Sequence, residues 1–167
     1  MGNFIGYRVD PIMYKKYHEK SEFNKNFGKS TEKIIIQFND DTISSVPLTS
    51  EKFNEIFDKI KNTNEVIIRS NNVRLILTYP LTKQYTEIID VPKDGLTLGP
   101  LLRIIVNAYE NIFKIKETSK NGNNNEDLQN KKEKEDYGVW GHSLEDLSLI
   151  SIIFNSNSNE ISVEVDS

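Results

Sequence analysis

The sequence predicts an α+β fold: an antiparallel sheet of hairpins and a meander, with two main helices packed mostly on one face. Short apolar runs separated by turn residues follow one another, so most strands are expected to pair with their neighbours in sequence. Clear helical spacing of apolar residues occurs over two longer segments, 51–61 and 97–117. A doubly wound parallel sheet is not expected, because strands and helices do not alternate along the chain.

Length and composition favour one core. The chain has 167 residues, of which 37% are hydrophobic, enough for a single α+β domain at 31–167 behind an N-terminal arm at 1–30. It contains no cysteine, which excludes disulfides and thiolate chemistry and is typical of a reducing compartment. No apolar run is long enough for a transmembrane helix or a signal peptide. We therefore expect a soluble, cytoplasmic protein. The excess of Lys over Arg, with frequent Asn and Ile, is typical of an AT-rich genome.

The arm at 1–30 is basic and aromatic. Residues 1–33 carry a net charge of +3, although the whole chain carries −4. Acidic residues are mixed into the arm and the rest of the chain is negative, so a nucleic-acid partner is not expected. We expect the arm to dock on the core or to contact a protein partner. The arm residues proposed for that contact are Arg8, Lys15, Lys16, Tyr17 and Lys20.

Gly2 is a candidate for lipidation. Removal of Met1 would expose Gly2, as N-myristoylation requires, but the usual pattern has Ser or Thr where this chain has Gly6. One acyl chain gives only marginal anchoring, and the basic arm would supply the second, electrostatic attraction to a membrane. Peripheral membrane binding is therefore an alternative function.

The domain is expected to start with a hairpin and a short helix. An apolar run at 33–38 predicts a buried strand, and 42–48 predicts its antiparallel return after a tight turn. Ser50 is expected to cap the helix at 51–61. One face of this helix is apolar and consists of Phe53, Ile56, Phe57 and Ile60.

The middle of the chain predicts a meander and then the central helix. Apolar runs at 65–69, 73–79 and 85–91 are joined by polar turns. Thr97 is expected to cap the helix at 97–117. Its core-facing stripe is Leu98, Leu101, Leu102, Ile105, Tyr109, Ile112 and Lys116. Further apolar residues widen this stripe, so we expect protein on more than one side of the helix; they are Ile104, Ala108, Phe113 and Ile115.

The last part of the chain predicts a loop and a hairpin. Residues 118–136 are dense in Asn, Lys and Glu, which predicts a mobile loop. Ser143 and Asp146 have capping-box spacing around one helical turn. Apolar runs at 147–154 and 160–165 then predict a final hairpin, whose second strand alternates apolar and polar residues.

His142 is the strongest candidate for chemistry. It lies beside Trp140 and Ser143, and a general base that activates a hydroxyl group or water is one interpretation. However, a base and a nucleophile on adjacent residues at a helix start do not face each other. Ser143 also has a sufficient structural role in the capping box. A small hydrolase or transferase that uses His142 is therefore only the second alternative function.

Neither a metal nor a cofactor is predicted. The sequence lacks ligand spacing such as His-x-x-x-His, and Gly95 and Gly99 do not match a phosphate-binding loop. The preferred interpretation is a non-enzymatic protein-protein interaction or scaffold domain with an unknown protein partner. Trp140 and His142 are expected to contribute to its contact surface, and a second copy of the chain is a further candidate partner.

Overall fold

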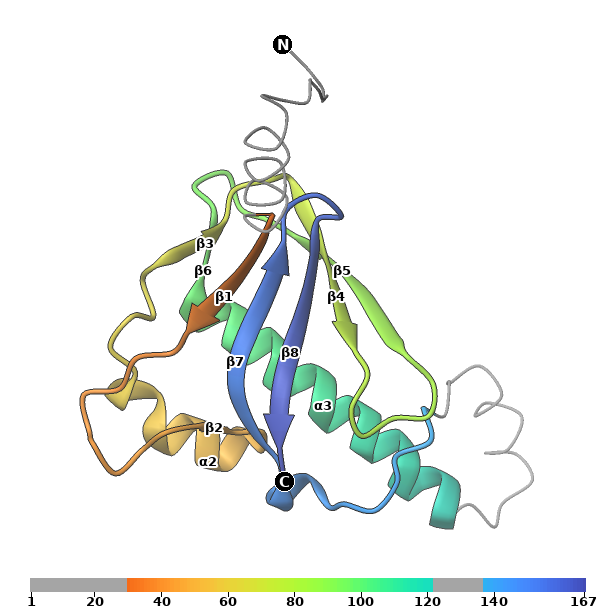
Figure 1. Ribbon diagram of the computed structural model, residues 1–167. Helices are drawn as coiled ribbons and strands as arrows, with labels where there is room; N and C mark the ends of the chain where they lie inside the picture. Colours follow the sequence, from red (N-terminus) through yellow and green to blue (C-terminus); the bar gives the residue numbers. More distant parts are fainter. Residues whose placement is uncertain (1–29, 122–136) are drawn as a thin grey trace, which may run out of the picture.

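The computed structural model describes residues 30–121 and 137–167, with the side chains of residues 116–121 left out. Within these ranges the fold is α+β, with a mixed, mostly antiparallel sheet and two helices (Figure 1). The strands are β1 (Thr31–Ile35), β2 (Val46–Pro47), β3 (Val66–Ile68), β4 (Asn72–Leu77), β5 (Tyr85–Asp90), β6 (Leu96–Thr97), β7 (Ser148–Asn155) and β8 (Glu160–Asp166). The helices are α2 (Ser50–Ile56) and α3 (Leu98–Asn121), and the 3₁₀ turns are η1 (Phe57–Lys59) and η2 (Leu144–Asp146).

The main sheet has the order β1-β7-β8-β4-β5, and β2 also pairs with β7. The final hairpin is confirmed, since β7 and β8 pair antiparallel with Asn155 opposite Glu160. This hairpin occupies the middle of the sheet (Figure 1), where β8 runs parallel to β4. The prediction of a purely antiparallel sheet is therefore wrong, because the last strand inserts beside a strand formed much earlier in the chain.

The first predicted hairpin, 33–38 with 42–48, is also wrong. β1 and β2 do not pair with each other, and both pair antiparallel with β7, with Ile35 opposite Ser151 and Val46 opposite Leu149. They form one interrupted edge of the sheet. The sequence pattern correctly indicated strand, turn and strand, but the partner of both strands lies more than a hundred residues away in sequence.

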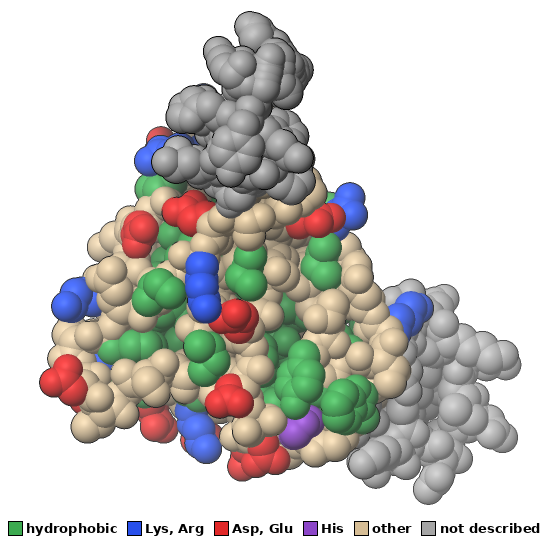
Figure 2. All heavy atoms as spheres, in the orientation of Figure 1, with side chains coloured by type: hydrophobic (Ala, Val, Ile, Leu, Met, Phe, Trp, Pro, Cys, Tyr) green, Lys and Arg blue, Asp and Glu red, His purple; other side chains and the backbone are tan. Residues whose placement is uncertain are grey.

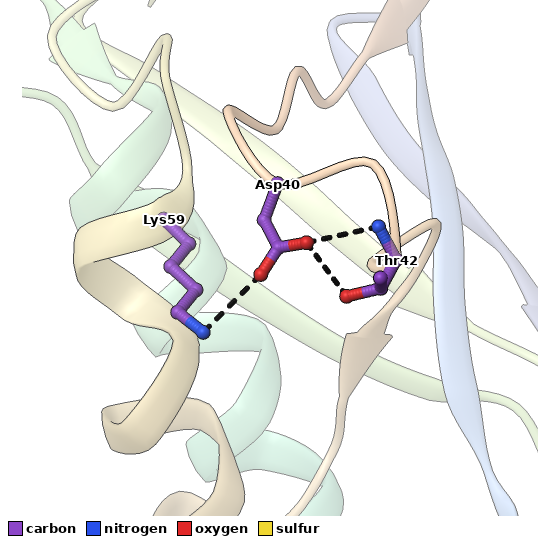
Figure 3. A network of polar contacts seen from close by, with 3 residues as sticks. All are labelled: Asp40, Thr42 and Lys59. Carbon is purple, nitrogen blue, oxygen red and sulfur yellow. Dashed lines mark hydrogen bonds and ion pairs between the residues drawn. The ribbon is translucent and has the colours of Figure 1, made fainter.

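Residues 36–45 leave the sheet between β1 and β2, and polar contacts hold this excursion (Figure 3). The Asp40 carboxylate accepts hydrogen bonds from the Thr42 backbone N–H at 2.9 Å and the Thr42 hydroxyl at 2.6 Å. Lys59 of η1 pairs with the other carboxylate oxygen at 3.3 Å. An isolated bridge between Phe38 and Ile60 adds a backbone contact to the same region. The excursion is therefore attached to the segment that follows α2.

The predicted meander is confirmed only for β4 and β5, where Val73 lies opposite Ile89. β3 pairs instead with β6, a short strand that the sequence did not predict. Gly95 makes this pairing fit, because its φ is 100° and an added Cβ would lie 2.6 Å from Val66 Cγ1. Thr97 ends β6 and directly precedes Leu98, the first residue of α3, so it lies at the N-cap position that the sequence predicted.

α3 runs behind the main sheet in the view of Figure 1. The predicted core stripe is buried from Leu98 to Ile112, and Ala108 and Phe113 are buried as well. The helix continues to Asn121, so the predicted loop at 118–136 is wrong for its first four residues. Neither Gly nor Pro interrupts the sequence between Pro100 and Gly122, which explains the longer helix. The rest of that loop lies outside the described residues.

α2 begins one residue earlier than predicted, and Ser50 is its first residue rather than its cap. Thr49 occupies the N-cap position, but its side chain makes no capping hydrogen bond. The predicted apolar face is confirmed, since Phe53 and Ile60 are buried and Ile56 and Phe57 are half-buried against the core. The predicted helix at 51–61 is shorter than expected and ends in η1.

Candidate functional site

The backbone that carries Trp140 and His142 is attached to the connection between β4 and β5. Val139 forms an antiparallel bridge with Leu81. The Trp140 N–H donates to the Pro80 carbonyl oxygen at 3.1 Å. Gly141 then has a φ of 73°, a conformation that L side chains rarely adopt, and it turns the chain toward His142.

Tyr79 joins Trp140 and His142 in an aromatic cluster. The ring centroid of Tyr79 lies 5.8 Å from that of Trp140 and 5.6 Å from that of His142. The centroids of Trp140 and His142 are 5.9 Å apart. The Tyr79 and Trp140 rings meet edge to face at 81°, a favourable geometry for an aromatic pair. The aromatic cluster, defined as Tyr79, Trp140 and His142, is thus a single packed unit.

Hydrogen bonds connect the aromatic cluster to the core. The Tyr79 hydroxyl lies 2.8 Å from His142 Nε2 and 3.2 Å from Ser167 Oγ. From α3, the Tyr109 hydroxyl donates to the Tyr79 carbonyl oxygen at 2.8 Å. Burial raises the pKa of the Tyr109 hydroxyl above its ordinary value, because a buried phenolate would lose its hydration. Tyr109 therefore stays neutral and keeps donating this hydrogen bond.

The Ser143 hydroxyl bonds to Asp146 rather than to the neighbouring His142. Both the N–H and the hydroxyl of Ser143 donate to Asp146 Oδ2, at 3.4 and 2.9 Å, so the predicted capping box is confirmed. The nearest polar partner of the imidazole is instead the phenol of Tyr79. Within residues 30–121 and 137–167, no group of three or more His, Asp or Glu side chains is arranged to hold a metal ion.

Trp140 is the exposed member of the aromatic cluster, with 48% of its surface open to solvent. His142 and Tyr79 are half-buried. In the space-filling view of Figure 2, hydrophobic side chains gather at the lower rim of the molecule, next to a histidine coloured purple. Glu145 and Asp146 follow in η2 and are exposed. The cluster therefore presents an indole ring next to acidic surface.

The structure brings together Trp140 and His142, which the sequence singled out, and adds Tyr79 to them. Tyr79 was missed as a site residue because it lies more than sixty positions from His142. The available signal was the alternation of β4, in which buried Val73, Leu75 and Leu77 predict that residue 79 also turns toward the core side. The remaining candidates lie outside the described residues; they are Gly2, Arg8, Lys15, Lys16, Tyr17 and Lys20.

In the part of the chain that the structure describes, no helix is both long and apolar enough to cross a bilayer. Comparison with known proteins adds no relative: no family model, no curated protein and no solved structure matches this chain.

Proposed function

We propose that this chain is a non-enzymatic protein-interaction domain that contacts its partner through the aromatic cluster. The observation that carries the proposal is the half-exposed indole of Trp140, packed against Tyr79 and His142. Exposed Trp and Tyr side chains on a fixed support provide large contact areas and are enriched among the residues that dominate binding energy.

Preorganisation of the cluster supports this role. The Trp140 backbone is fixed by its hydrogen bond to Pro80, and the Tyr79 phenol contacts the imidazole of His142. Tyr109 holds the Tyr79 carbonyl from the core helix. A partner that covers Trp140 would therefore lose little of its binding free energy to ordering the site.

The hydrogen bonds of the site also favour binding over catalysis. A general base needs a hydrogen bond to the group that it deprotonates, and His142 Nε2 bonds to the Tyr79 hydroxyl rather than to the serine hydroxyl beside it in sequence. The adjacent Ser143 hydroxyl is directed to Asp146. We therefore prefer the interaction domain to a hydrolase or transferase. The absence of cysteine from the sequence supports a reducing compartment, so the partner is expected in the cytoplasm.

The test is recovery of interacting proteins from the native cell by the tagged wild-type chain, the Trp140→Ala variant and the Ile150→Ala variant. Ile150 is a matched control, because it is another partly exposed large apolar residue, located on β7. We expect a protein that the wild type and Ile150→Ala recover and that Trp140→Ala loses, with all three chains melting at similar temperatures. Equal recovery by Trp140→Ala would remove the aromatic cluster from the contact surface.

A further inference from the structure

We infer that the outer edge of β5 binds an extended, basic peptide segment of a partner protein by strand addition. This inference rests on the proposed function only in that both require a protein partner. It concerns a different surface, since β5 forms one margin of the main sheet (Figure 1). Within residues 30–121 and 137–167, the only strand that pairs with β5 is β4.

The backbone register identifies the groups that are open at this edge. The Val91 N–H donates to the Asn71 carbonyl oxygen, directly across the β4–β5 pair. Hydrogen-bonded and non-hydrogen-bonded positions alternate in an antiparallel pair, so Ile89 and Glu87 also face β4. The N–H and C=O groups of Thr86 and Ile88 therefore point away from the sheet. They form a row of exposed donors and acceptors with which an extended chain can pair.

The opposite margin of the sheet, formed by β1 and β2, has features that hinder the addition of a further strand, and β5 does not have them. There, β1 and β2 are interrupted by residues 36–45, and Pro47 ends the edge. At the end of β1, the Asn62 amide donates to the Ile35 carbonyl oxygen at 3.0 Å and accepts from the Gln37 N–H at 2.9 Å. β5 runs for six residues without proline, and its pairing with β4 shows no bulge. An interruption, a proline and a bulge are usual protections of an edge strand, and β5 has none of the three.

The side chains of β5 define the chemistry of the added strand. Ile88 is 59% exposed, the largest value among the exposed large hydrophobic residues of the described chain. An apolar side chain on the added strand could pack against Ile88 and remove it from water. Both charged residues of β5 are acidic: Asp90 is exposed, and Glu87 is half-buried and accepts a hydrogen bond from the Tyr85 hydroxyl at 2.6 Å. Basic residues on the added strand would therefore be attracted, because opposite charges on adjacent strands stabilise the pairing.

The same charges argue against a second copy of this chain as the occupant. Two β5 strands paired across a twofold axis at Glu87 would place the Glu87 side chains of the two copies opposite each other, and an axis at Asp90 would do the same for Asp90. Like charges on adjacent strands destabilise pairing. A strand from a different protein, with Lys or Arg between apolar residues, has no such repulsion.

Residues 137–139 form backbone contacts with the segment that directly precedes β5. The Lys83 N–H donates to the Tyr137 carbonyl oxygen at 3.1 Å, and Val139 bridges to Leu81. The rings of Tyr85 and Tyr137 lie 5.3 Å apart. An added strand along β5 would lie beside this established pairing.

The test uses a labelled Lys-Val-Lys-Val-Thr-Val-Lys peptide and the full chain. Fluorescence anisotropy would measure peptide binding, and NMR hydrogen exchange would follow the Thr86 and Ile88 amides. We expect both amides to exchange rapidly in the free protein and to be protected by the peptide. Thr86→Pro removes an N–H that points away from β4, which edge strands tolerate, and should weaken binding by about fivefold or more. Thr86→Val keeps the N–H and should bind like the wild type.

A second control does not depend on folding of a variant. The same peptide with alternate N-methylated residues cannot pair along one edge and should not bind the wild-type chain. Equal affinity of the plain and N-methylated peptides, or no binding of the plain peptide, would overturn the inference. Protection of the Thr86 and Ile88 amides without peptide would also overturn the inference. If that protection rises with protein concentration, a second copy of the chain covers the edge; if it does not, the chain itself covers it. None of these outcomes changes the test of the proposed function, which compares the proteins recovered by the wild type and by Trp140→Ala.

Discussion

Glu110 on α3 caps the amino-terminal end of α2 through Ser50. The Ser50 N–H donates to Glu110 Oε2 at 2.9 Å, and the Ser50 hydroxyl donates to Oε1. A carboxylate at this position satisfies a backbone N–H that no helical carbonyl can reach and lies at the positive end of the helix dipole. The cap thus comes from a different helix, sixty residues away in sequence, and it fixes the position of α2 against α3.

Loss of this cap should destabilise the domain. Glu110→Ala is expected to lower the free energy of unfolding by about 0.5–2 kcal/mol, the range measured for loss of an N-cap. Urea denaturation followed by circular dichroism would measure the change. Glu110→Gln keeps one acceptor oxygen and should lose less. If Glu110→Ala and Glu110→Gln were as stable as the wild type, the contact with Ser50 would have no energetic role.

Loss of a buried side chain from α3 is expected to lower the free energy of unfolding by more than loss of the Glu110 cap. Leu102 is fully buried, so Leu102→Ala should lower the free energy of unfolding by about 2–5 kcal/mol through lost burial and the cavity left behind. Asn107 is exposed on the same helix, and Asn107→Ala should change stability by less than about 0.5 kcal/mol. Thermal and urea unfolding of both variants would check the contrast. Equal stability of the two would mean that α3 is not the core helix.

The contact between Tyr79 and His142 can be measured by a double-mutant cycle. Tyr79→Phe removes the hydroxyl that lies 2.8 Å from His142 Nε2, and His142→Ala removes the imidazole. We expect the two changes to be non-additive by about 1 kcal/mol, since a neutral hydrogen bond contributes about 0.5–1.5 kcal/mol. Unfolding free energies of the two single variants and the double variant give the coupling. Strict additivity would show that the two side chains do not interact in solution.

The hydrogen bonds of the Asp40 carboxylate should make the stability of the domain depend on pH in the acid range. Hydrogen bonds from the Thr42 hydroxyl and the Thr42 N–H, and then the one from Lys59, lower the pKa of the Asp40 carboxyl to about 2. An unfolded Asp has a pKa of about 3.9. The folded state therefore binds this proton less readily, so the stabilisation is fully present above about pH 4 and is lost as the pH falls toward 2.

Asp40→Asn should remove this part of the acid sensitivity. Denaturation midpoints measured between about pH 5 and 2 are expected to fall less steeply for Asp40→Asn than for the wild type. Asp41→Asn, at the exposed neighbouring position, is the matched control and should keep the wild-type slope. Identical slopes for the wild type and Asp40→Asn would contradict the hydrogen-bonded role of Asp40.

The sequence predicted those features that depend on local pattern. The stripe of α3, the β4–β5 hairpin, the β7–β8 hairpin and the capping box at Ser143 all rest on residues close together in sequence. Pairing between distant segments was not accessible in this way. Nothing near β1 indicates that β7 is its partner, and nothing near Ser50 indicates that Glu110 caps it. For the same reason, Trp140 and His142 were recognised from the sequence and Tyr79 was not.

The central position of the last hairpin has a consequence for biosynthesis. β1 and β4 are made early, but the two strands that join them into one sheet are the last elements of the described chain. Until β7 and β8 leave the ribosome, β1 has no strand partner and β4 has only β5. The sheet is therefore expected to be completed only once β7 and β8 have been translated, and a nascent chain that stalls before residue 148 would expose unpaired strands to chaperones.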